Sequence, residues 1–403
     1  MATIVFFCIP AHGHTNPTLN VVRELIARGH RIIYYSYDEF RAKIEDTGAE
    51  FVSCNGFDAQ LHLTKEEGAK IGSDLALSTR VLVDTTLSLD GPVCRAMEQL
   101  RPDCIVADSM AVWGKAVAKK LGIPFVCSTT TFAFNRESAK IMPHSLKETL
   151  SMIASMGRVS AQVKRLQQRG YPVKNVLELI GSDESVPTVV YTSALFQPCS
   201  DTFPAHFAFV GPSIRPAQTE VKKTGEKLVY ISMGTVNNDM LPLYRACIQA
   251  VTGTGWQVIL SVGHQVDRAG LGTLPENVAV YESVDQIAVL KEADAFLTHC
   301  GMNSASEGLY FGVPLVMLPQ TSEQRGVAAR AEQLGAGLRL RKTTPSAIRA
   351  ALEAAMSDSA YRENAQKISA SFRASGGAKA AADCIEACFR AGESGSQKPI
   401  SPV

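Results

Sequence analysis

Short, continuously apolar segments alternate with helical patterns along this chain, and this alternation restricts the fold more than any other feature. In the first half, strand-like segments cover residues 3–9, 31–37, 104–107 and 124–128. A second series covers residues 227–232, 258–260, 278–280, 295–297 and 315–317. Continuous apolar strands joined by helices indicate parallel sheets that are covered by helices on both faces. The sequence therefore predicts an α/β protein with two doubly wound parallel sheets.

Length and composition indicate two domains. The chain has 403 residues, which is too many for one ordinary core. The stretch 211–226 is rich in proline, glycine and charge, so we interpret it as a linker. We predict a first domain over residues 1–210, a second over 227–375, and a last helix with a polar tail over 376–403. Residues 137–170 are helical and polar in pattern and would extend the first domain.

The first predicted helix has sequence signals at both ends. Asn16 is a suitable N-cap and Pro17 a suitable first helical residue. Gly29 is a typical residue just after a helix end. The apolar residues between them that recur at helical spacing are Leu19, Val22 and Ile26. We therefore expect this helix to begin at Pro17.

The composition is typical of a soluble protein from a reducing compartment. Hydrophobic residues make up 46% of the chain, and the net charge of +1 favours neither nucleic acid nor an anionic membrane. The first residues lack a basic segment, and no apolar run reaches membrane-spanning length. Ten cysteines without a Cys-x-x-Cys pair predict reduced thiols and a cytoplasmic location. Cys384 and Cys388 share a helix face, either as packed thiols or in a metal or redox role.

Residues 298–308 connect a predicted strand to a helix through a glycine-containing turn. Such a turn presents free backbone N–H groups, and the positive end of a helix dipole, to an anion. Its glycine and side-chain donors are His299, Gly301, Asn303 and Ser304. Glu307 follows Asn303 by one helical turn, where a carboxylate suits the vicinal hydroxyls of a ribose. The turn is therefore predicted to bind a nucleotide diphosphate.

His14 and Asp108 form a predicted catalytic pair in the first domain. His14 follows the first strand and Asp108 ends the strand 104–107, so both fall at the same edge of the sheet. A carboxylate beside an imidazole fixes its tautomer and stabilises the imidazolium, which makes a general base for a hydroxyl group. His12 is the competing base. As structural alternatives, His14 would serve only as a cap or loop donor at the helix N-terminus, and Asp108 only as a cap of the following helix.

Several separated motifs resemble those of the family 1 glycosyltransferases, in particular the bacterial macrolide glycosyltransferases. Residues 299–308 read His-Cys-Gly-Met-Asn-Ser-x-x-Glu-Gly, followed by Val-Pro-Leu and then Pro-Gln-x-x-Glu-Gln. Gly-His-Thr-Asn-Pro at 13–17 and Phe-Val-Gly-Pro at 209–212 also match, so the resemblance covers most of the chain. It implies the GT-B fold: two tandem Rossmann-like domains with an interdomain cleft, and a C-terminal helix that crosses back to the first domain.

The resemblance also implies residue roles. His14 is the catalytic base and Asp108 its partner, while Gln286 reads the nucleobase edge and Glu323 and Gln324 contact sugar hydroxyls. The predicted donor-binding residues are Ser232, Thr235, Val284, Gln286, His299, Gly301, Asn303, Ser304, Glu307, Glu323 and Gln324. The alternative to donor binding is ordinary helix capping for Ser232 and Thr235. For Gln286, Glu323 and Gln324 it is a place in a solvated loop.

Two positions depart from the family pattern, and both concern the donor. Ser283 stands where an aromatic residue often stacks on the base, with Val284 and Asp285 in place of Val-Pro, and Glu323 stands where Asp is commoner. The chain contains no Asp-x-Asp motif. We therefore expect no required metal and no other cofactor, with His299 and a helix N-terminus stabilising the diphosphate.

An apolar cleft in the first domain is predicted to bind the acceptor. Its candidate residues, each of which has core packing as the alternative, are Phe57, Met110, Trp113, Phe132 and Phe134. The resemblance implies an inverting enzyme that moves a sugar, with UDP-glucose as the expected donor, to a hydroxyl of a lipophilic molecule such as a macrolide, a flavonoid or another phenol. The product would be a β-O-glycoside. A nucleotide-sugar epimerase or hydrolase, and a catalytically silent nucleotide-sugar-binding protein, are the alternatives.

Overall fold

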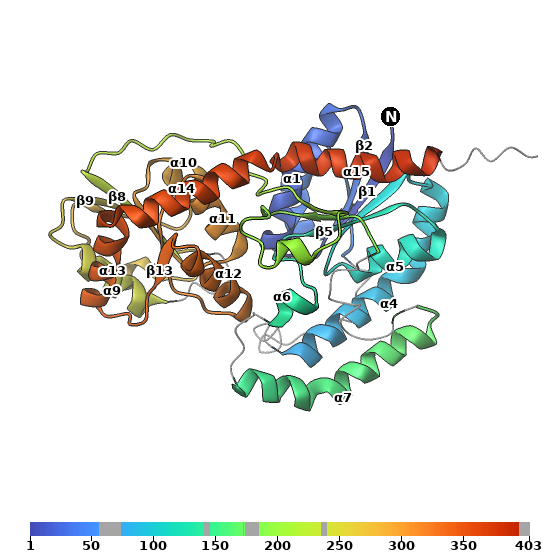
Figure 1. Cartoon of the computed structure of the whole chain (residues 1–403), viewed down its shortest axis with the longest axis horizontal. Coiled ribbons are helices and arrows are strands. Elements are labelled where there is room, and N and C mark those ends of the chain that lie inside the picture. Colours follow the sequence, from blue (N-terminus) through green and yellow to red (C-terminus); the bar gives the residue numbers. More distant parts are fainter. Residues whose placement is uncertain (56–73, 141–145, 172, 174–184, 235–239, 395–403) are drawn as a thin grey trace, which may run out of the picture. The chain divides into compact units, whose positions relative to one another are not determined.

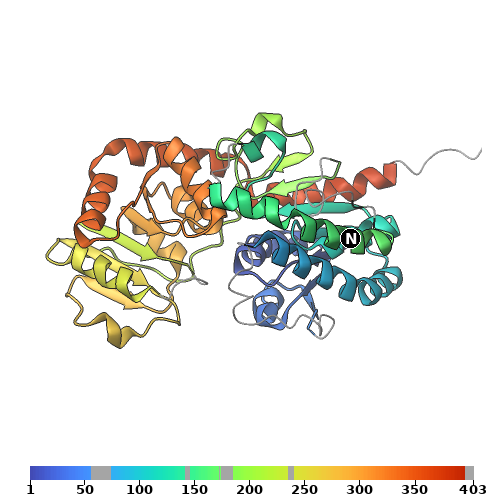
Figure 2. The same ribbon diagram turned by 90° about the horizontal axis from the view of Figure 1, so that it is seen from below.

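The computed structural model of this chain describes residues 1–55, 74–140, 146–171, 173, 185–234 and 240–394. They form two compact units, which Figures 1 and 2 show in two views. The first unit comprises Met1–Ser213 and Ser375–Val403, and the second comprises Ile214–Ala374. Each unit contains one sheet, and every strand pairing in the described residues is parallel. This is the α/β architecture that the sequence predicts.

The first unit is built on a seven-stranded sheet of order β3-β2-β1-β4-β5-β6-β7. Its strands are β1 Thr3–Phe7, β2 Arg31–Ser36, β3 Glu50–Ser53, β4 Cys104–Asp108, β5 Phe125–Thr129, β6 Thr188–Val190 and β7 Phe207–Phe209. Its α-helices are α1 His12–Ala27, α2 Arg41–Glu45, α4 Leu75–Leu100, α5 Val112–Leu121, α6 Arg136–Lys140, α7 Leu146–Gln168 and α15 Gly377–Ser394, with short 3-10 turns at Asp38–Phe40 and Ser200–Thr202. The strand order reverses direction between β1 and β4, and ligands bind beside such a switch point in doubly wound sheets.

The residues of β1 explain why the strands of this sheet are apolar without interruption. Ile4 and Phe6 pack on the side of α1 and α15, whereas Val5 and Phe7 pack on the side of α4 and α5. Figure 1 shows the two pairs of helices on opposite faces of the sheet. Because successive side chains of a strand point to opposite faces, a sheet covered on both faces buries nearly all residues of its central strands.

The helix α1 begins earlier than the sequence predicts. Its first residue is His12 and its N-cap is the extended residue Ala11, so the expectation of an N-cap at Asn16 was wrong. The N–H groups of His14 and Thr15 both donate to the carbonyl of Ala11 and close the first turn. Pro17 therefore lies inside the helix, where its missing N–H costs one hydrogen bond near an exposed end. His14 is consequently held in a helical turn and not in a loop.

The second unit is built on a six-stranded sheet of order β10-β9-β8-β11-β12-β13. Its strands are β8 Lys227–Ser232, β9 Trp256–Ser261, β10 Val278–Tyr281, β11 Ala295–Thr298, β12 Leu315–Met317 and β13 Gly337–Arg339. Its helices are α9 Leu241–Val251, α10 Gln286–Glu292, α11 Met302–Tyr310, α12 Ser322–Gln333, α13 Pro345–Ser357 and α14 Ser359–Ala374, with a 3-10 turn at Arg268–Leu271. The switch point of this sheet lies between β8 and β11.

The central strand β8 again packs on both faces. Val229 and Ile231 belong to a core that includes residues of α9 and α13, whereas Tyr230 stacks on Phe296 with 4.8 Å between the ring centroids. The segment before β8, which includes the predicted linker from residue 214 on, is hydrogen bonded to this unit. The N–H of Thr224, for example, donates to Gln257.

Among the residues that the structure describes, no helix has both the length and the apolarity needed to cross a membrane.

A buried hydrogen bond between His30 and Glu386 fastens α15 to the rest of the first unit. The N–H of Ala2 donates to Nδ1 of His30, so Nε2 of His30 carries the proton and donates to Glu386 at 2.8 Å. The side chain of Glu386 is 9% exposed. Burial alone would raise the pKa of this carboxyl, but the hydrogen bond from His30 and the charges of Arg390 and Arg28 hold it below its usual range.

The Glu386→Gln variant should lower the free energy of unfolding by about 1–3 kcal/mol at neutral pH, because it removes charge-assisted hydrogen bonds from a buried site. Since the folded-state pKa is depressed, this contribution is complete above the ordinary carboxyl pKa of about 4.3 and disappears as pH falls through the folded value. Urea denaturation at neutral and acidic pH measures it. Asp383→Asn is the matched control, since Asp383 also pairs with Arg28 but is 70% exposed. Equal effects of the two variants would contradict the prediction.

Candidate functional site

The structure brings His14 and Asp108 together at the switch point of the first sheet. His14 lies in the first turn of α1, after β1, and Asp108 is the last residue of β4. Nδ1 of His14 is 2.7 Å from Oδ2 of Asp108, and Oδ1 of Asp108 accepts the N–H of Met110 at 2.8 Å. The side chains are 19% and 1% exposed, respectively. A buried carboxylate thus holds an imidazole that solvent can reach.

A third side chain, Thr130, joins this pair. Its hydroxyl oxygen lies 3.1 Å from Nδ1 of His14, and the residue is 2% exposed. A carboxylate oxygen accepts hydrogen bonds, so in the neutral ring the N–H at Nδ1 donates to Asp108 and the lone pair is on Nε2. Sequence reasoning did not identify Thr130. The available signal was the hydroxyl-rich run at residues 128–131, which begins at the end of β5 and continues beyond it at the same edge of the sheet.

His12, the competing base, faces a different environment. It is exposed, its Nδ1 is 3.4 Å from Nζ of Lys43, and its ring meets Phe40 edge-on at 5.0 Å. Burial of part of the ring and the charge of Lys43 lower the pKa of His12, against a smaller raising effect of Glu39. The two histidines thus have different partners: His14 has the carboxylate of Asp108, and His12 has the cation Lys43.

In the second unit, the predicted anion-binding turn connects β11 to α11. Cys300 has a φ of 62°, in the left-handed region that non-glycine residues rarely adopt, and Gly301 is the N-cap of α11. Gly301 has no side chain to occupy the first N–H groups of the helix. Asn303 and Ser304 follow in the first turn and are half-buried. A helix that begins with a glycine N-cap is a geometry that suits a phosphate at its N-terminus.

The imidazole of His299 is packed closely against two glycines. A Cβ atom at position 301 would lie 2.6 Å from Nε2 of His299, and one at position 234 would lie 2.6 Å from Cε1. Burial lowers the pKa of His299 to about 4, although the backbone of Ser232 acts in the opposite direction. His299 is therefore neutral at pH 7 and has one N–H group instead of a positive charge.

Glu307 and Gln286 come together from helices α11 and α10. Nε2 of Gln286 is 2.5 Å from Oε2 of Glu307, and the hydroxyl of Tyr230 donates to Oε1 of Gln286 at 3.1 Å. Burial raises the pKa of Glu307, while the hydrogen bond from Gln286 and the charge of Arg215 partly oppose this and Asp285 adds to it. Tyr230 was predicted only as a strand residue, and no feature of its apolar strand distinguished it.

The remaining predicted donor residues lie at the same edge of the sheet, after the carboxyl ends of its strands. Ser232 ends β8 and is 6% exposed, and Val284 is half-buried before α10. Glu323 is exposed in the first turn of α12. Oε1 of Gln324 accepts the N–H groups of Gln320 and Thr321 in a capping box, which leaves its NH₂ group as a donor. Thr235 lies outside the described residues.

The predicted acceptor residues differ in their surroundings. Trp113 and Phe132 are each 2% exposed and pack in the interior, Phe132 against Phe196 at 5.6 Å. Met110 and Phe134 are half-buried. Phe57 lies outside the described residues. Of the four described candidates, Met110 and Phe134 thus have side-chain surface that a ligand can contact.

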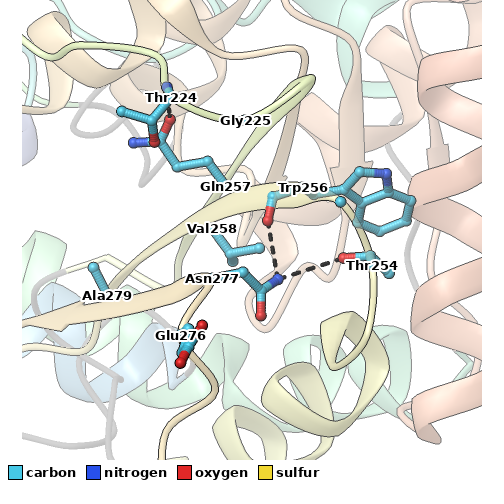
Figure 3. Close-up of a pocket in the computed structure, with 10 residues that line it drawn as sticks. Thr224, Gly225, Thr254, Trp256, Gln257, Val258, Glu276, Asn277 and Ala279 are labelled. Atoms are coloured by element: carbon cyan, nitrogen blue, oxygen red, sulfur yellow. Dashed lines mark hydrogen bonds between the residues drawn. The ribbon is translucent and has the colours of Figure 1, made fainter.

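An open concavity of about 400 Å³ lies at the other edge of the second sheet, before the amino ends of β8, β9 and β10. Figure 3 shows its lining, which includes Trp256 and Asn277. The amide of Asn277 donates to the carbonyl of Trp256 at 2.9 Å and to Thr254 at 3.5 Å. These polar groups serve the fold, and the concavity includes none of the predicted donor residues.

Comparisons with known proteins indicate the family of this chain. Residues 246–386 match the family model described as the erythromycin biosynthesis protein CIII-like C-terminal domain. The NDP-glycosyltransferase YjiC of Bacillus licheniformis is 34% identical and covers 95% of this chain and 97% of its own. The oleandomycin glycosyltransferase of Streptomyces antibioticus is 30% identical over 96% of this chain and 90% of its own.

A solved structure is also similar over nearly the whole chain. The glycotransferase of kitacinnamycin superimposes with a TM-score of 0.84 at 31% identity, and the match covers 96% of this chain and 98% of that chain. Identity of 30% or more over nearly the whole length of both chains shows the family to which this chain belongs. The chain belongs to the family 1 glycosyltransferases of the GT-B fold, and it is a glycosyltransferase.

Proposed function

We propose that this enzyme transfers a sugar, with glucose from UDP-glucose as the expected case, to a hydroxyl group of a lipophilic small molecule and inverts the anomeric carbon. The observation that carries the proposal is the 2.7 Å contact between His14 and Asp108. It gives the glycosyltransferase a base whose tautomer is fixed, and such a base suits the activation of an alcohol or phenol.

In the proposed reaction, Nε2 of His14 takes the proton of the acceptor hydroxyl. The acceptor oxygen forms a bond to the anomeric carbon from the side opposite the phosphate. The bond between that carbon and the phosphate oxygen breaks, and its electron pair leaves with the nucleoside diphosphate. Asp108 stabilises the imidazolium through Nδ1, and Thr130 helps to orient the ring. An α-linked donor thus gives a β-O-glycoside.

The donor is proposed to lie along α11. The diphosphate would accept hydrogen bonds from the first N–H groups of the helix, from Asn303 and Ser304, and from His299. Glu307 would accept the ribose hydroxyls, with its orientation set by Gln286. The NH₂ group of Gln324 and the carboxylate of Glu323 would contact the sugar. The identity of the sugar is the least constrained part of the proposed donor, because Glu323 is exposed and its side chain is long.

The acceptor is proposed to be a macrolide, a flavonoid or another phenol. Two similar proteins support this class: the oleandomycin glycosyltransferase, by its name, and the glycotransferase of kitacinnamycin. Met110 is the first candidate contact, since its N–H is bonded to Asp108 and the residue is half-buried.

Transfer is expected to continue at an unchanged rate in the presence of a chelator such as EDTA. The N-terminus of α11 and the N–H donors around it can stabilise the leaving diphosphate, as preorganised dipoles do in other active sites. Initial rates with chelator, with added Mg²⁺ and with neither would be compared. Loss of transfer with chelator that Mg²⁺ or Mn²⁺ restores would contradict this expectation.

A mass-resolved product assay tests the proposed function directly. The purified protein would be incubated with UDP-glucose and a mixed panel of macrolides, flavonoids and simple phenols. We expect a product that is heavier by one hexose and an equal amount of UDP, and the product should be a β-glycoside by NMR. Release of a free sugar or an epimer without acceptor would overturn the proposal. Transfer only from another nucleotide sugar would correct the donor.

A further inference from the structure

The side chain of Asp285 is tied to a segment 70 residues earlier in the chain. Asp285 is the N-cap of α10, yet its carboxylate makes no capping bond to that helix. It accepts hydrogen bonds from Nη2 of Arg215 at 2.5 Å and from the backbone N–H groups of Gln218 and Thr219 at 2.6 and 2.9 Å. The carboxylate is 6% exposed. This network holds residues 215–219 against the loop before α10.

The network fixes the guanidinium of Arg215 by its edge. Nη2 donates to Asp285 and Nη1 donates to the carbonyl of Pro216 at 2.9 Å. The side chain is nevertheless 36% exposed. A guanidinium that is bonded through its edge can still present a flat face, and such a plane stacks on aromatic rings.

A role for Arg215 can be inferred from the order of diphosphate, ribose and base in a nucleotide. This inference rests on the proposed function. If the diphosphate binds at Gly301, Glu307 lies six residues further along α11, or about 9 Å, which is the place of the ribose. Glu307 is bonded to Gln286, the residue after Asp285. The positive charge of Arg215 lowers the pKa of Glu307, and the negative charge of Asp285 raises it. The base, which follows the ribose, would therefore extend toward Asp285 and Arg215.

A base at this place needs a flat partner, because base stacking contributes about 1–3 kcal/mol wherever a protein supplies an aromatic or guanidinium plane. Residue 283, where the family resemblance implies an aromatic side chain, is an exposed serine. We propose that Arg215, held by Asp285, is the residue on which the nucleobase stacks, and that it replaces the aromatic side chain absent at position 283. Stacking of this kind does not discriminate between uracil and thymine, so both nucleotides should bind.

The test compares variants of Arg215 by calorimetric titration of the whole protein with UDP, dTDP and ribose 5-diphosphate, which lacks a base. Arg215→Lys keeps a positive charge for Asp285 but removes the plane. It should weaken binding of UDP and dTDP by about 5- to 150-fold and leave binding of ribose 5-diphosphate unchanged. Adding Ser283→Trp to Arg215→Lys should restore most of the lost affinity for UDP.

Arg362→Lys is the matched control. Arg362 also pairs with a partly buried aspartate, Asp294, in the same unit, and its side chain is 39% exposed. It should bind all three ligands like the unmodified protein. An equal loss of affinity for UDP and ribose 5-diphosphate in Arg215→Lys, or no loss for either, would overturn the stacking proposal. Failure of the unmodified protein to bind UDP or dTDP would instead overturn the proposed donor site.

Discussion

Replacement of His14 by alanine is expected to reduce the turnover number by about 100- to 10,000-fold, the range that general base catalysis typically contributes. The affinity for UDP should stay unchanged, because His14 belongs to the first unit and the proposed donor contacts belong to the second. The side chain is 19% exposed and lies in the first turn of α1, so its loss should leave the fold intact. Initial rates with a phenolic acceptor and calorimetric titration with UDP measure the two quantities.

His12→Ala is the matched control for this prediction. It removes the same side chain two residues earlier, in the same helical turn, from an exposed ring beside Lys43. It should keep turnover within a few-fold of the unmodified enzyme. Turnover of His14→Ala like that of the unmodified enzyme would end the assignment of His14 as the base, and a large loss in His12→Ala alone would move the base to that residue.

Replacement of Gly234 by alanine is expected to weaken UDP binding by about 10- to 150-fold, equivalent to one lost charge-assisted hydrogen bond. A Cβ atom there would lie 2.6 and 2.7 Å from Cε1 and Nε2 of His299, so the imidazole must leave its place. The φ of Gly234 is +83°, and an L-residue in this region costs about 1–2 kcal/mol of stability. Titration with UDP and urea denaturation separate the two effects.

Gly253→Ala separates backbone strain from the displacement of His299. Gly253 lies in the same unit and has a φ of +74°, but an added Cβ would meet no heavy atom within 4 Å. Both variants should lose a similar amount of stability, and only Gly234→Ala should lose affinity for UDP. If Gly234→Ala binds UDP like the unmodified protein, the position of His299 does not matter for the diphosphate.

The agreement between sequence and structure is best for features that depend on local pattern. The strands around residues 4, 32, 105 and 229 were recognisable because both faces of each sheet are buried, which leaves a continuous apolar run. The turn at residues 298–308 was recognisable because a strand, a glycine and a helix follow one another within eleven residues. The start of α1 was missed because Ala11 carries no capping side chain.

The features that the sequence left open depend on contacts between distant segments. Thr130 reaches His14 across 116 positions, and Tyr230 reaches Gln286 across 56. Asp285 showed as a departure from a pattern, but its partner Arg215 lies 70 positions away in a stretch predicted as a linker. Neither spacing nor composition predicts such pairs, because side-chain contact depends on which strand ends the sheet order brings together.

The sequence by itself therefore determined the architecture, the family resemblance and the candidate pair His14 and Asp108, since periodic burial and short motifs are written along the chain. Only the tertiary structure decided which histidine the carboxylate holds, that burial lowers the pKa of His299 to about 4, and that Arg215 is bonded to Asp285. The physical reason is that burial, charge and hydrogen-bond geometry are properties of neighbours in space, and a parallel sheet makes neighbours of residues far apart in sequence.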